Sequence, residues 1–131
     1  MSRSVWIWLL PDVLLAAHDE QLAEHGGAVG IRDANLFESA LARPQNLAAY
    51  EEPDAAQLAA AYAFGLAKNH PFVDGNKRTA LVTLEAFLLL NGFLLEASDA
   101  ECVMAILRLA ASELSEEDLA VWVREKIRPA L

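Results

Sequence analysis

The sequence predicts an all-α fold, a compact bundle of about six helices around a central buried helix that begins near Asn76. Three observations lead to this prediction. Apolar residues recur at helical spacing in a series of short segments, and no segment reads as a strand. The run from Ala80 to Leu90 is apolar except at Thr83 and Glu85, as in a helix buried on nearly all sides. Hydrophobic residues make up 55% of the chain, which favours packed helices.

Length and net charge indicate how many domains the chain has and which kinds of partner it can bind. A chain of 131 residues suits a single core, and we expect residues 1–131 to form one domain. Ten Lys and Arg residues against nineteen Asp and Glu residues give a net charge of −9, so we expect no direct nucleic-acid partner. Cys102 is the single cysteine and lies in an apolar pattern, which predicts a buried side chain and no disulfide.

The first apolar segment runs from Val5 to Leu10 and contains two tryptophans. Pro11 and Asp12 close it after six residues, which is shorter than the apolar region of a secretory signal. We predict an extended or turn segment whose aromatic side chains pack on the domain. No apolar run approaches the ~20 residues of a membrane-spanning helix. We therefore expect a cytoplasmic protein with no membrane partner.

The first helix is expected from Pro11 to about Glu24, because proline suits the first turn of a helix. Its predicted apolar stripe consists of Val13, Leu14, Ala17 and Leu22. His18 and His25 are expected to be packing or surface residues, since no partner ligand has the spacing of a metal site. Gly26-Gly27 ends this helix.

Asp33 is expected to cap a second helix from Ala34 to Ala42. Arg43-Pro44 should end that helix, because the residue before a proline avoids the helical conformation. The stretch from Gln45 to Pro53 is then the only sizeable irregular segment between helices.

Capping signals mark the remaining helices. Asp54 begins a third helix up to Asn69, whose many alanines permit close packing, and Asn91-Gly92 ends the central helix. Ser98-Asp99 begins a fifth helix to about Ser112. Ser115, followed by three acidic residues, predicts a sixth helix to Arg128.

Between the third and central helices lies a polar nonamer, His70-Pro71-Phe72-Val73-Asp74-Gly75-Asn76-Lys77-Arg78. Gly75 permits a ligand to approach the backbone closely. The first N–H groups of the helix that starts near Asn76 have no partner within the helix, and they create an anion site together with the helix dipole. Lys77 and Arg78 place cations where the dipole favours carboxylates, which suggests that a phosphate ligand supplies the negative charge.

Two further side chains complete this predicted site. Asp74 lies at its mouth and could hold Mg²⁺ against phosphate oxygens. His70 could take a proton from a hydroxyl group, as imidazoles often do. The structural alternative is that Asp74 caps the helix, His70 packs in a turn and both cations are solvated. We favour the ligand site because six suitable groups converge on one helix start.

The nonamer resembles the motif of the Fic/Doc family, His-x-Phe-x-(Asp/Glu)-(Gly/Ala)-Asn-(Gly/Lys)-Arg. The likeness extends over about Leu14 to Gly92, including His25-Gly26-Gly27 and Gly30-Ile31-Arg32-Asp33. Enzymes with this motif typically transfer AMP from ATP to a protein hydroxyl. Lys77 replaces the glycine that leaves room for phosphates in those enzymes, and this lysine marks the death-on-curing (Doc) branch. Gly75 instead matches the general Fic consensus.

Members of the Doc branch are toxins of toxin–antitoxin pairs that phosphorylate a threonine of elongation factor Tu. The resemblance therefore implies ATP and Mg²⁺ as ligands, a separate antitoxin chain as partner and elongation factor Tu as the expected target. The residues implied as catalytic are His70, Asp74, Asn76, Lys77 and Arg78. The residues implied to bind nucleotide are Gly75, Asn76, Lys77 and Arg78, and Asp74 is the implied metal ligand.

Three functions remain open at this point. A Doc-type protein kinase is favoured by Lys77, and AMP transfer is favoured by Gly75. The third is an inactive binding module kept for its antitoxin. In Fic proteins a flap holds the target segment by its backbone, and Asn46 and Tyr50 between Gln45 and Pro53 could do similar work. Ser112 to Glu117 only partly matches the family's inhibitory motif, which favours restraint by a separate antitoxin.

Overall fold

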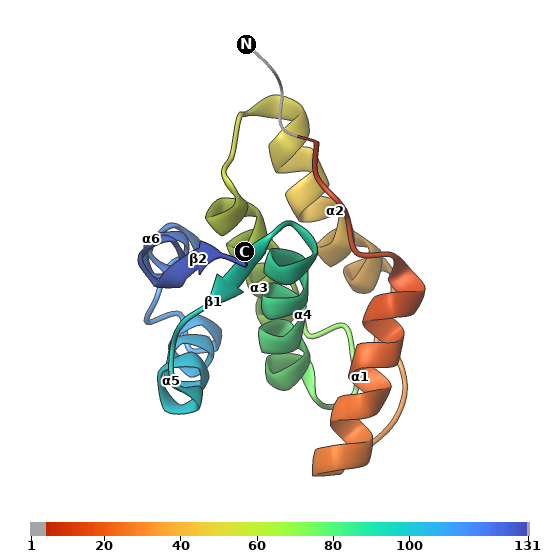
Figure 1. Cartoon of the computed structure of the whole chain (residues 1–131). Helices are drawn as coiled ribbons and strands as arrows, with labels where there is room; N and C mark the ends of the chain where they lie inside the picture. The colour runs from red at the N-terminus through yellow and green to blue at the C-terminus, as the bar shows by residue number, and fades with distance from the viewer. Residues whose placement is uncertain (1–4, 131) are drawn as a thin grey trace.

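The computed structural model describes residues 5–130, and the other five residues of the predicted domain lie outside the described part. Six helices and a two-stranded sheet are arranged as Figure 1 shows. Their bounds are α1 Pro11–His25, α2 Ala34–Tyr50, α3 Ala55–Asn69, α4 Asn76–Leu90, β1 Phe93–Leu95, α5 Asp99–Ala110, α6 Glu116–Lys126 and β2 Ile127–Pro129. The all-α prediction is confirmed, and the two strands are the elements that the sequence did not predict.

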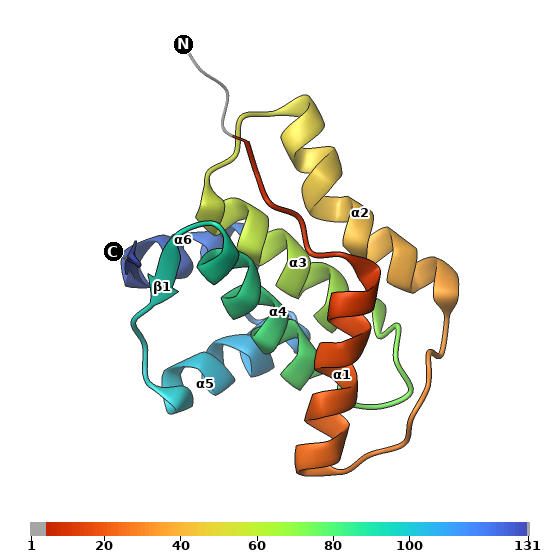
Figure 2. The same cartoon turned by 45° about the vertical axis from the view of Figure 1, so that its right-hand side comes forward.

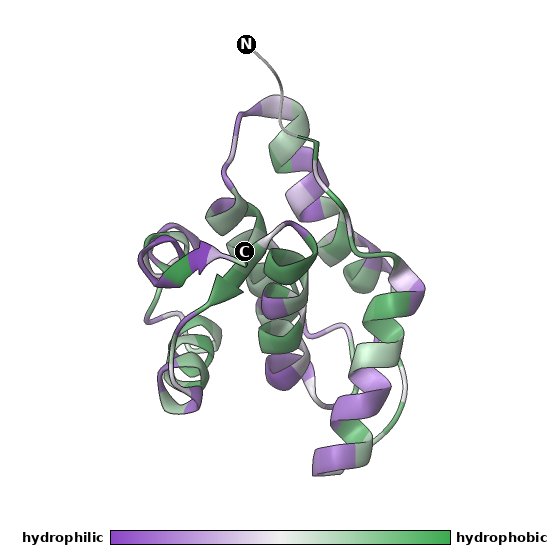
Figure 3. Cartoon of the chain, in the orientation of Figure 1, coloured by the Kyte–Doolittle hydropathy of each residue, from purple (hydrophilic) through white to green (hydrophobic). Residues whose placement is uncertain are grey.

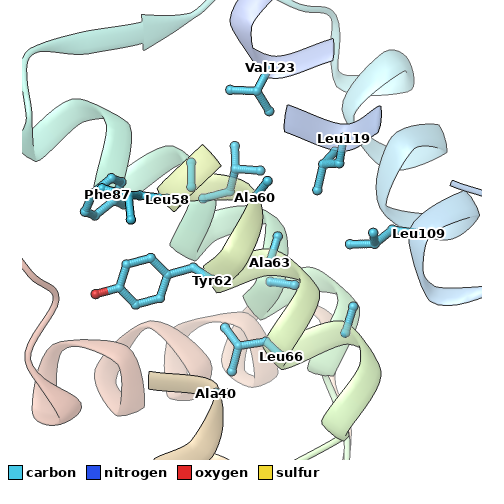
Figure 4. Packing of buried hydrophobic residues seen from close by; sticks show 14 of the residues in the cluster. Ala40, Leu58, Ala60, Tyr62, Ala63, Leu66, Phe87, Leu109, Leu119 and Val123 are labelled. Atoms are coloured by element: carbon cyan, nitrogen blue, oxygen red, sulfur yellow. The ribbon is translucent and has the colours of Figure 1, made fainter. Parts of the chain in front are cut away.

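Helix α3 lies at the centre of the bundle, where it packs against α2, α4 and α6 and also contacts α5. Eleven of its fifteen residues are buried, most of them alanines whose small side chains let neighbouring helices approach. A Cβ atom at Gly65 would lie 3.0 Å from the Cα of Ala40, so α2 and α3 nearly touch there. Figure 4 shows side chains from the surrounding helices converging on α3.

Helix α4 begins at Asn76, as predicted, but the centre of the bundle is the neighbouring α3, and α4 is less buried than the sequence suggested. Its exposed residues are Lys77, Arg78, Glu85, Leu89 and Leu90. Figure 3 shows the hydrophilic first turn at the lower end of this helix. The apolar run predicted more buried residues than α4 has, because one face of this helix is left uncovered between α1 and α5 (Figure 2).

Helix α2 does not end before Pro44, so that prediction was wrong. A proline inside a helix costs ~3 kcal/mol because it removes a hydrogen bond and crowds the preceding turn. Tertiary contacts offset this cost: Pro44 is buried, and Leu47 and Ala48 in the next turn pack against the core. Arg43 also forms an ion pair with Glu116 of α6. The helix therefore continues to Tyr50.

The apolar face of α1 also differs from the predicted stripe. Its buried residues are Leu14, His18 and Leu22, which are spaced by four residues. Val13 is 49% exposed instead of buried. His18 was expected only to be a packing or surface residue, and it occupies a core position.

The segment before α1 is extended, as predicted, and its two indole rings pack on α4. The rings of Trp6 and Trp8 lie 6.2 and 6.0 Å from the ring of Phe87, centroid to centroid. The side chain of Asn91 forms hydrogen bonds with both the N–H and the carbonyl of Ile7, at 2.9 and 3.0 Å. The Asn91 amide therefore binds the backbone of Ile7 through the same two groups that a neighbouring β-strand would use.

The predicted sixth helix ends at Lys126 rather than at Arg128, because the chain turns into β2. Strand β2 pairs antiparallel with β1, with Leu94 opposite Arg128. The N–H of Ala130 also donates to the carbonyl of Gly92, at 2.9 Å. This pairing joins segments far apart in the sequence, so local patterns did not predict it.

Several local predictions are confirmed. Asp33, Asp54, Ser98 and Ser115 cap their helices through side-chain hydrogen bonds. Cys102 is a buried free thiol, whose pKa is raised by its burial and further by nearby acidic groups. Over residues 5–130, no helix combines the length and apolarity needed to cross a membrane.

Candidate functional site

The first six residues of the nonamer form the connection between α3 and α4, and its last three begin α4. The connection lies against the one between α1 and α2 (Figure 2). His70 ends α3 in the left-handed conformation, with φ 50°, and its side chain is exposed. Four residues later Asp74 is exposed as well. Both side chains thus face solvent at the edge of the bundle.

The N-terminal end of α4 has no side-chain cap. Its N-cap residue is Gly75, which has a φ of 79° that residues with a Cβ rarely adopt. The Asp74 carboxylate does not cap the helix but accepts a hydrogen bond from the N–H of Ala28, at 3.0 Å. The structural alternative for Asp74 is therefore wrong, and the first turn of α4 is open to an anion.

Asn76 stabilises the turn that precedes this open end. Its side-chain oxygen accepts from the N–H of Phe72 at 2.9 Å, and its side-chain nitrogen donates to the carbonyl of Phe72 at 3.0 Å. Asn76 is 8% exposed. Both ends of the amide are thus bound to the motif's own backbone, and the structure places Asn76 behind the open surface.

The two predicted cations lie in the first turn of α4, and both are exposed. Arg78 donates to the carbonyl of Gly26, at 3.2 Å. Lys77 forms no hydrogen bond or ion pair with any group in residues 5–130, so its ammonium group is free to bind a ligand. Lys68, in the last turn of α3, binds Ser112 and the carbonyl of Ala110 at the end of α5.

The segment between α1 and α2 contacts the nonamer along its length, which the sequence did not reveal. The N–H of Val73 donates to the carbonyl of Gly30 at 3.0 Å, and the N–H of Arg32 donates to the carbonyl of Pro71 at 2.6 Å. Ile31 and Phe72 form an isolated antiparallel bridge between these hydrogen bonds. The motif therefore lies in a short, strand-like pairing.

Gly27 shows how closely this segment approaches the site. A Cβ at Gly27 would lie 3.2 Å from the Cβ of Asp74 and 2.9 Å from a methyl group of Leu22. Its φ of 127° also disfavours any residue with a side chain. Because Gly27 has no side chain, the backbone after α1 can pack directly against Asp74.

Arg32 holds the end of α3 next to the site. Its guanidinium donates to the carbonyls of Asn69 at 2.8 Å and of His70 at 2.7 Å. These are among the last carbonyls of α3, where a cation also interacts favourably with the helix dipole. Arg32 therefore helps to hold His70 in its left-handed conformation.

The donor set fits a magnesium ion only if a ligand supplies most of the coordination. Within residues 5–130, no three His, Cys, Asp or Glu side chains gather to hold a metal. Mg²⁺ is commonly bound by one or two carboxylates together with substrate phosphates and waters. Asp74 supplies one exposed carboxylate beside the open end of α4, which suits a metal bound jointly with phosphate.

The segment suggested as a target-binding flap lies elsewhere. Gln45 to Tyr50 is the last part of α2, so the predicted irregular stretch is wrong in all but its last residues. Asn46 and Tyr50 line a cleft of about 670 Å³ between α2 and α6. No residue of the nonamer lines that cleft. The segment that does pair with the motif is the one from Gly30 to Arg32.

Comparisons with known proteins agree with this arrangement. A model described as the Fic/DOC family matches residues 8–88. The chain is similar to "Protein kinase doc" of Escherichia phage P1, with 40% identity over 83 residues, which cover 63% of this chain and 66% of that relative. It is also similar to "Toxin Doc" of Mycolicibacterium smegmatis, with 45% identity over 76 residues, which cover 55% of this chain and 57% of that relative.

The chain spans less than two thirds of the length of either of these relatives. The family model, in contrast, covers more than half of the 131 residues and includes the whole nonamer, together with the segment that pairs with it. The chain belongs to the Fic/DOC family.

Proposed function

We propose that the protein is a Doc-type toxin that transfers the γ-phosphoryl group of ATP to a Thr or Ser hydroxyl of a target protein. The observation that carries this proposal is the open first turn of α4, where Lys77 has no partner among residues 5–130 and Asp74 and His70 are exposed beside it. The printed names of the two relatives, a protein kinase and a toxin, support the same function. Elongation factor Tu is the proposed target, and the cytoplasm is the proposed place of action.

In this mechanism the backbone N–H groups of the first turn, Lys77 and Arg78 bind the phosphate oxygens of ATP. Asp74 would hold Mg²⁺, which neutralises charge on the phosphates when bound. His70 takes the proton of the target hydroxyl while the hydroxyl oxygen attacks the γ-phosphorus. The bond from the γ-phosphorus to the bridging oxygen breaks, and ADP leaves.

The target segment is proposed to bind beside the pairing between the nonamer and the segment that precedes α2. Three exposed apolar side chains lie there, with exposed fractions of 78% for Val29, 42% for Ile31 and 49% for Val73. Apolar side chains exposed together often mark a binding surface. They would hold the target with its hydroxyl close to His70.

A separate antitoxin chain is proposed as the inhibitor. The segment that partly matches the family's inhibitory motif includes Ser112, which has a φ of 63°, and Ser115, which caps α6. It therefore forms a turn between helices and not the inhibitory helix. This observation supports restraint by another protein.

AMP transfer is the second candidate, because Gly75 matches the general motif of the family, whose members typically transfer AMP. Lys77 separates the two reactions. A long side chain at this position occupies space that a glycine would leave for phosphates, and its charge can bind an anion directly. Both effects favour a pose in which the terminal phosphate, rather than the α-phosphate, faces His70.

The test uses parallel reactions with γ-labelled and α-labelled ATP, purified elongation factor Tu and Mg²⁺. We expect label on the target only from γ-labelled ATP. The Lys77→Gly variant should label the target more weakly from γ-labelled ATP and should gain some transfer from α-labelled ATP. Label from α-labelled ATP with the unmodified protein would favour AMP transfer, and no label from either would favour a binding module.

A further inference from the structure

A buried histidine outside the nonamer contacts the motif's backbone directly. His18, on α1, is 3% exposed, and its Nε2 atom lies 2.7 Å from the carbonyl oxygen of Asp74. Its ring stacks on that of Phe72, with centroids 3.7 Å apart and an interplanar angle of 8°. A Cβ at Gly75 would lie 3.6 Å from two atoms of the same ring. The imidazole is thus enclosed by three residues of the motif.

The chemistry of this contact fixes the role of the ring. A carbonyl oxygen can only accept a hydrogen bond, so Nε2 must bear the proton and donate it. The accepting carbonyl belongs to the peptide that joins Asp74 to the N-cap residue Gly75. Its orientation sets both the direction of the Asp74 side chain and the start of the open helix turn.

The place of His18 in α1 argues against packing alone. Leu14 and Leu22, one turn before and after it, fill the same buried face with apolar side chains. A polar group at such a position is costly unless it is hydrogen-bonded. Among the described residues, the one hydrogen bond of the His18 side chain is that to the carbonyl of Asp74. A leucine would fill the space but would leave this carbonyl without its donor.

We infer that His18 is a positioning residue of the phosphate and metal site: it holds the Asp74–Gly75 peptide so that Asp74 and the first turn of α4 face the same ligand. This inference rests on the proposed function for its effect on transfer. The contact itself is a property of the fold and can be tested without substrate.

The variants separate the hydrogen bond from the packing. His18→Phe keeps a ring that can stack on Phe72 but removes the donor, whereas His18→Gln removes the ring and restores an N–H donor. His25, which is exposed at the end of the same helix, provides the control variant His25→Gln. Calorimetry with Mg²⁺ and ATP, the rate of transfer from γ-labelled ATP and the melting temperature are measured for each.

We expect His18→Phe to keep a cooperative melting transition but to lose affinity for ATP with Mg²⁺ by roughly 10–100-fold, as when a group that orients a metal ligand is removed. His18→Gln should recover most of that affinity, and His25→Gln should match the unmodified protein. A folded His18→Phe variant with unchanged affinity and rate would overturn the inference, because packing alone would then explain the residue.

Two NMR measurements on the protein without ligand test the role of His18 independently of the proposed function. The His18 ring of the unmodified protein should bear its proton on Nε2, and a proton on Nδ1 alone would overturn the inference even if every variant failed to fold. The amide signals of Gly75 and Asn76 should move in His18→Phe and stay near their original positions in His18→Gln. Absence of transfer from ATP would reject the proposed function but would leave these two results to decide the role of His18.

Discussion

Helices α3 and α4 pack against each other in the core, but their N-terminal ends are completed by different groups. At α3, the Asp54 carboxylate accepts from the N–H of Gln57 and also binds Arg124, while the N–H of Asp54 donates to the side-chain oxygen of Gln57. At α4, the N-cap is Gly75, no side chain caps the helix, and Lys77 and Arg78 occupy the first turn.

The N-terminal ends of the other helices show that the uncapped, positively charged start of α4 is the unusual one. Asp33, Ser98 and Ser115 cap α2, α5 and α6, and α1 starts with Pro11 followed by an acidic residue. Helix α1 has no side-chain cap either, but Pro11 has no N–H that needs a partner, and Asp12 supplies negative charge in the first turn. The first turn of α4 has neither a cap nor an acidic residue, so its N–H donors stay free beside two cations. Changes around the N-terminal end of α4 should therefore lower activity, and changes at the N-terminal end of α3 should lower stability.

The largest effect is expected at His70. Removing a general base lowers a rate by about 10²–10⁴-fold, so His70→Ala should nearly abolish transfer of the γ-phosphoryl group. The free energy of unfolding of this variant should change little, because the His70 side chain is exposed. His70→Asn is a useful second variant, since asparagine tolerates the left-handed conformation. Transfer at the normal rate by either folded variant would reject the role of His70.

The next effect is expected at Asp74. Asp74→Asn keeps the shape and an oxygen for the N–H of Ala28 but loses the charge. We expect the affinity for ATP in the presence of Mg²⁺ to fall by at least about tenfold, with little change in melting temperature. Calorimetric titrations with and without Mg²⁺ measure this. Equal affinities for the variant and the unmodified protein would show that Asp74 is not a metal ligand.

The capped end should respond in the opposite way. Asp54→Ala removes the cap of α3, which typically costs about 1 kcal/mol, and the exposed pair with Arg124 adds little. The free energy of unfolding in urea should fall by that amount, while transfer from ATP stays normal. Asp54→Asn, which also caps helices well, should restore most of the loss. A large decrease in transfer by a folded Asp54→Ala would contradict the division between the two ends.

The smallest effect is a difference in acid stability. Burial raises the pKa of Asp54, but the hydrogen bonds from Arg124 and Gln57 outweigh it and place the pKa below the ordinary value of 3.8. The carboxylate thus adds stability above that value, and this stability is lost as the pH falls through the lower pKa of the folded state. Urea unfolding across this range should show a steeper loss for the unmodified protein than for Asp54→Asn.

Local signals in the sequence predicted much of the fold. Caps and apolar spacing are properties of a few neighbouring residues, so the starts of the helices that begin after Asp33, Asp54, Ser98 and Ser115 were predicted correctly. The helix through Pro44 was missed because its continuation depends on distant contacts. Strands β1 and β2 were missed for the same reason, since each has only three residues.

The site shows the same division. The nonamer is contiguous, so its residues and the open helix end could be predicted from the sequence. The groups that hold it, His18 and Arg32, come from segments separated from it by 56 and 37–38 positions. The spacing of His18 with Leu14 and Leu22 was a signal that it belongs to the core, although not that it contacts Asp74.

The turn at Asn91 and Gly92 binds the first and last described segments of the chain, through Ile7 and Ala130. Two neighbouring residues of one turn thus hold described segments that lie far apart in the sequence. Contacts of such high sequence separation raise the contact order of the fold, and a higher contact order slows folding relative to a bundle held by local contacts alone.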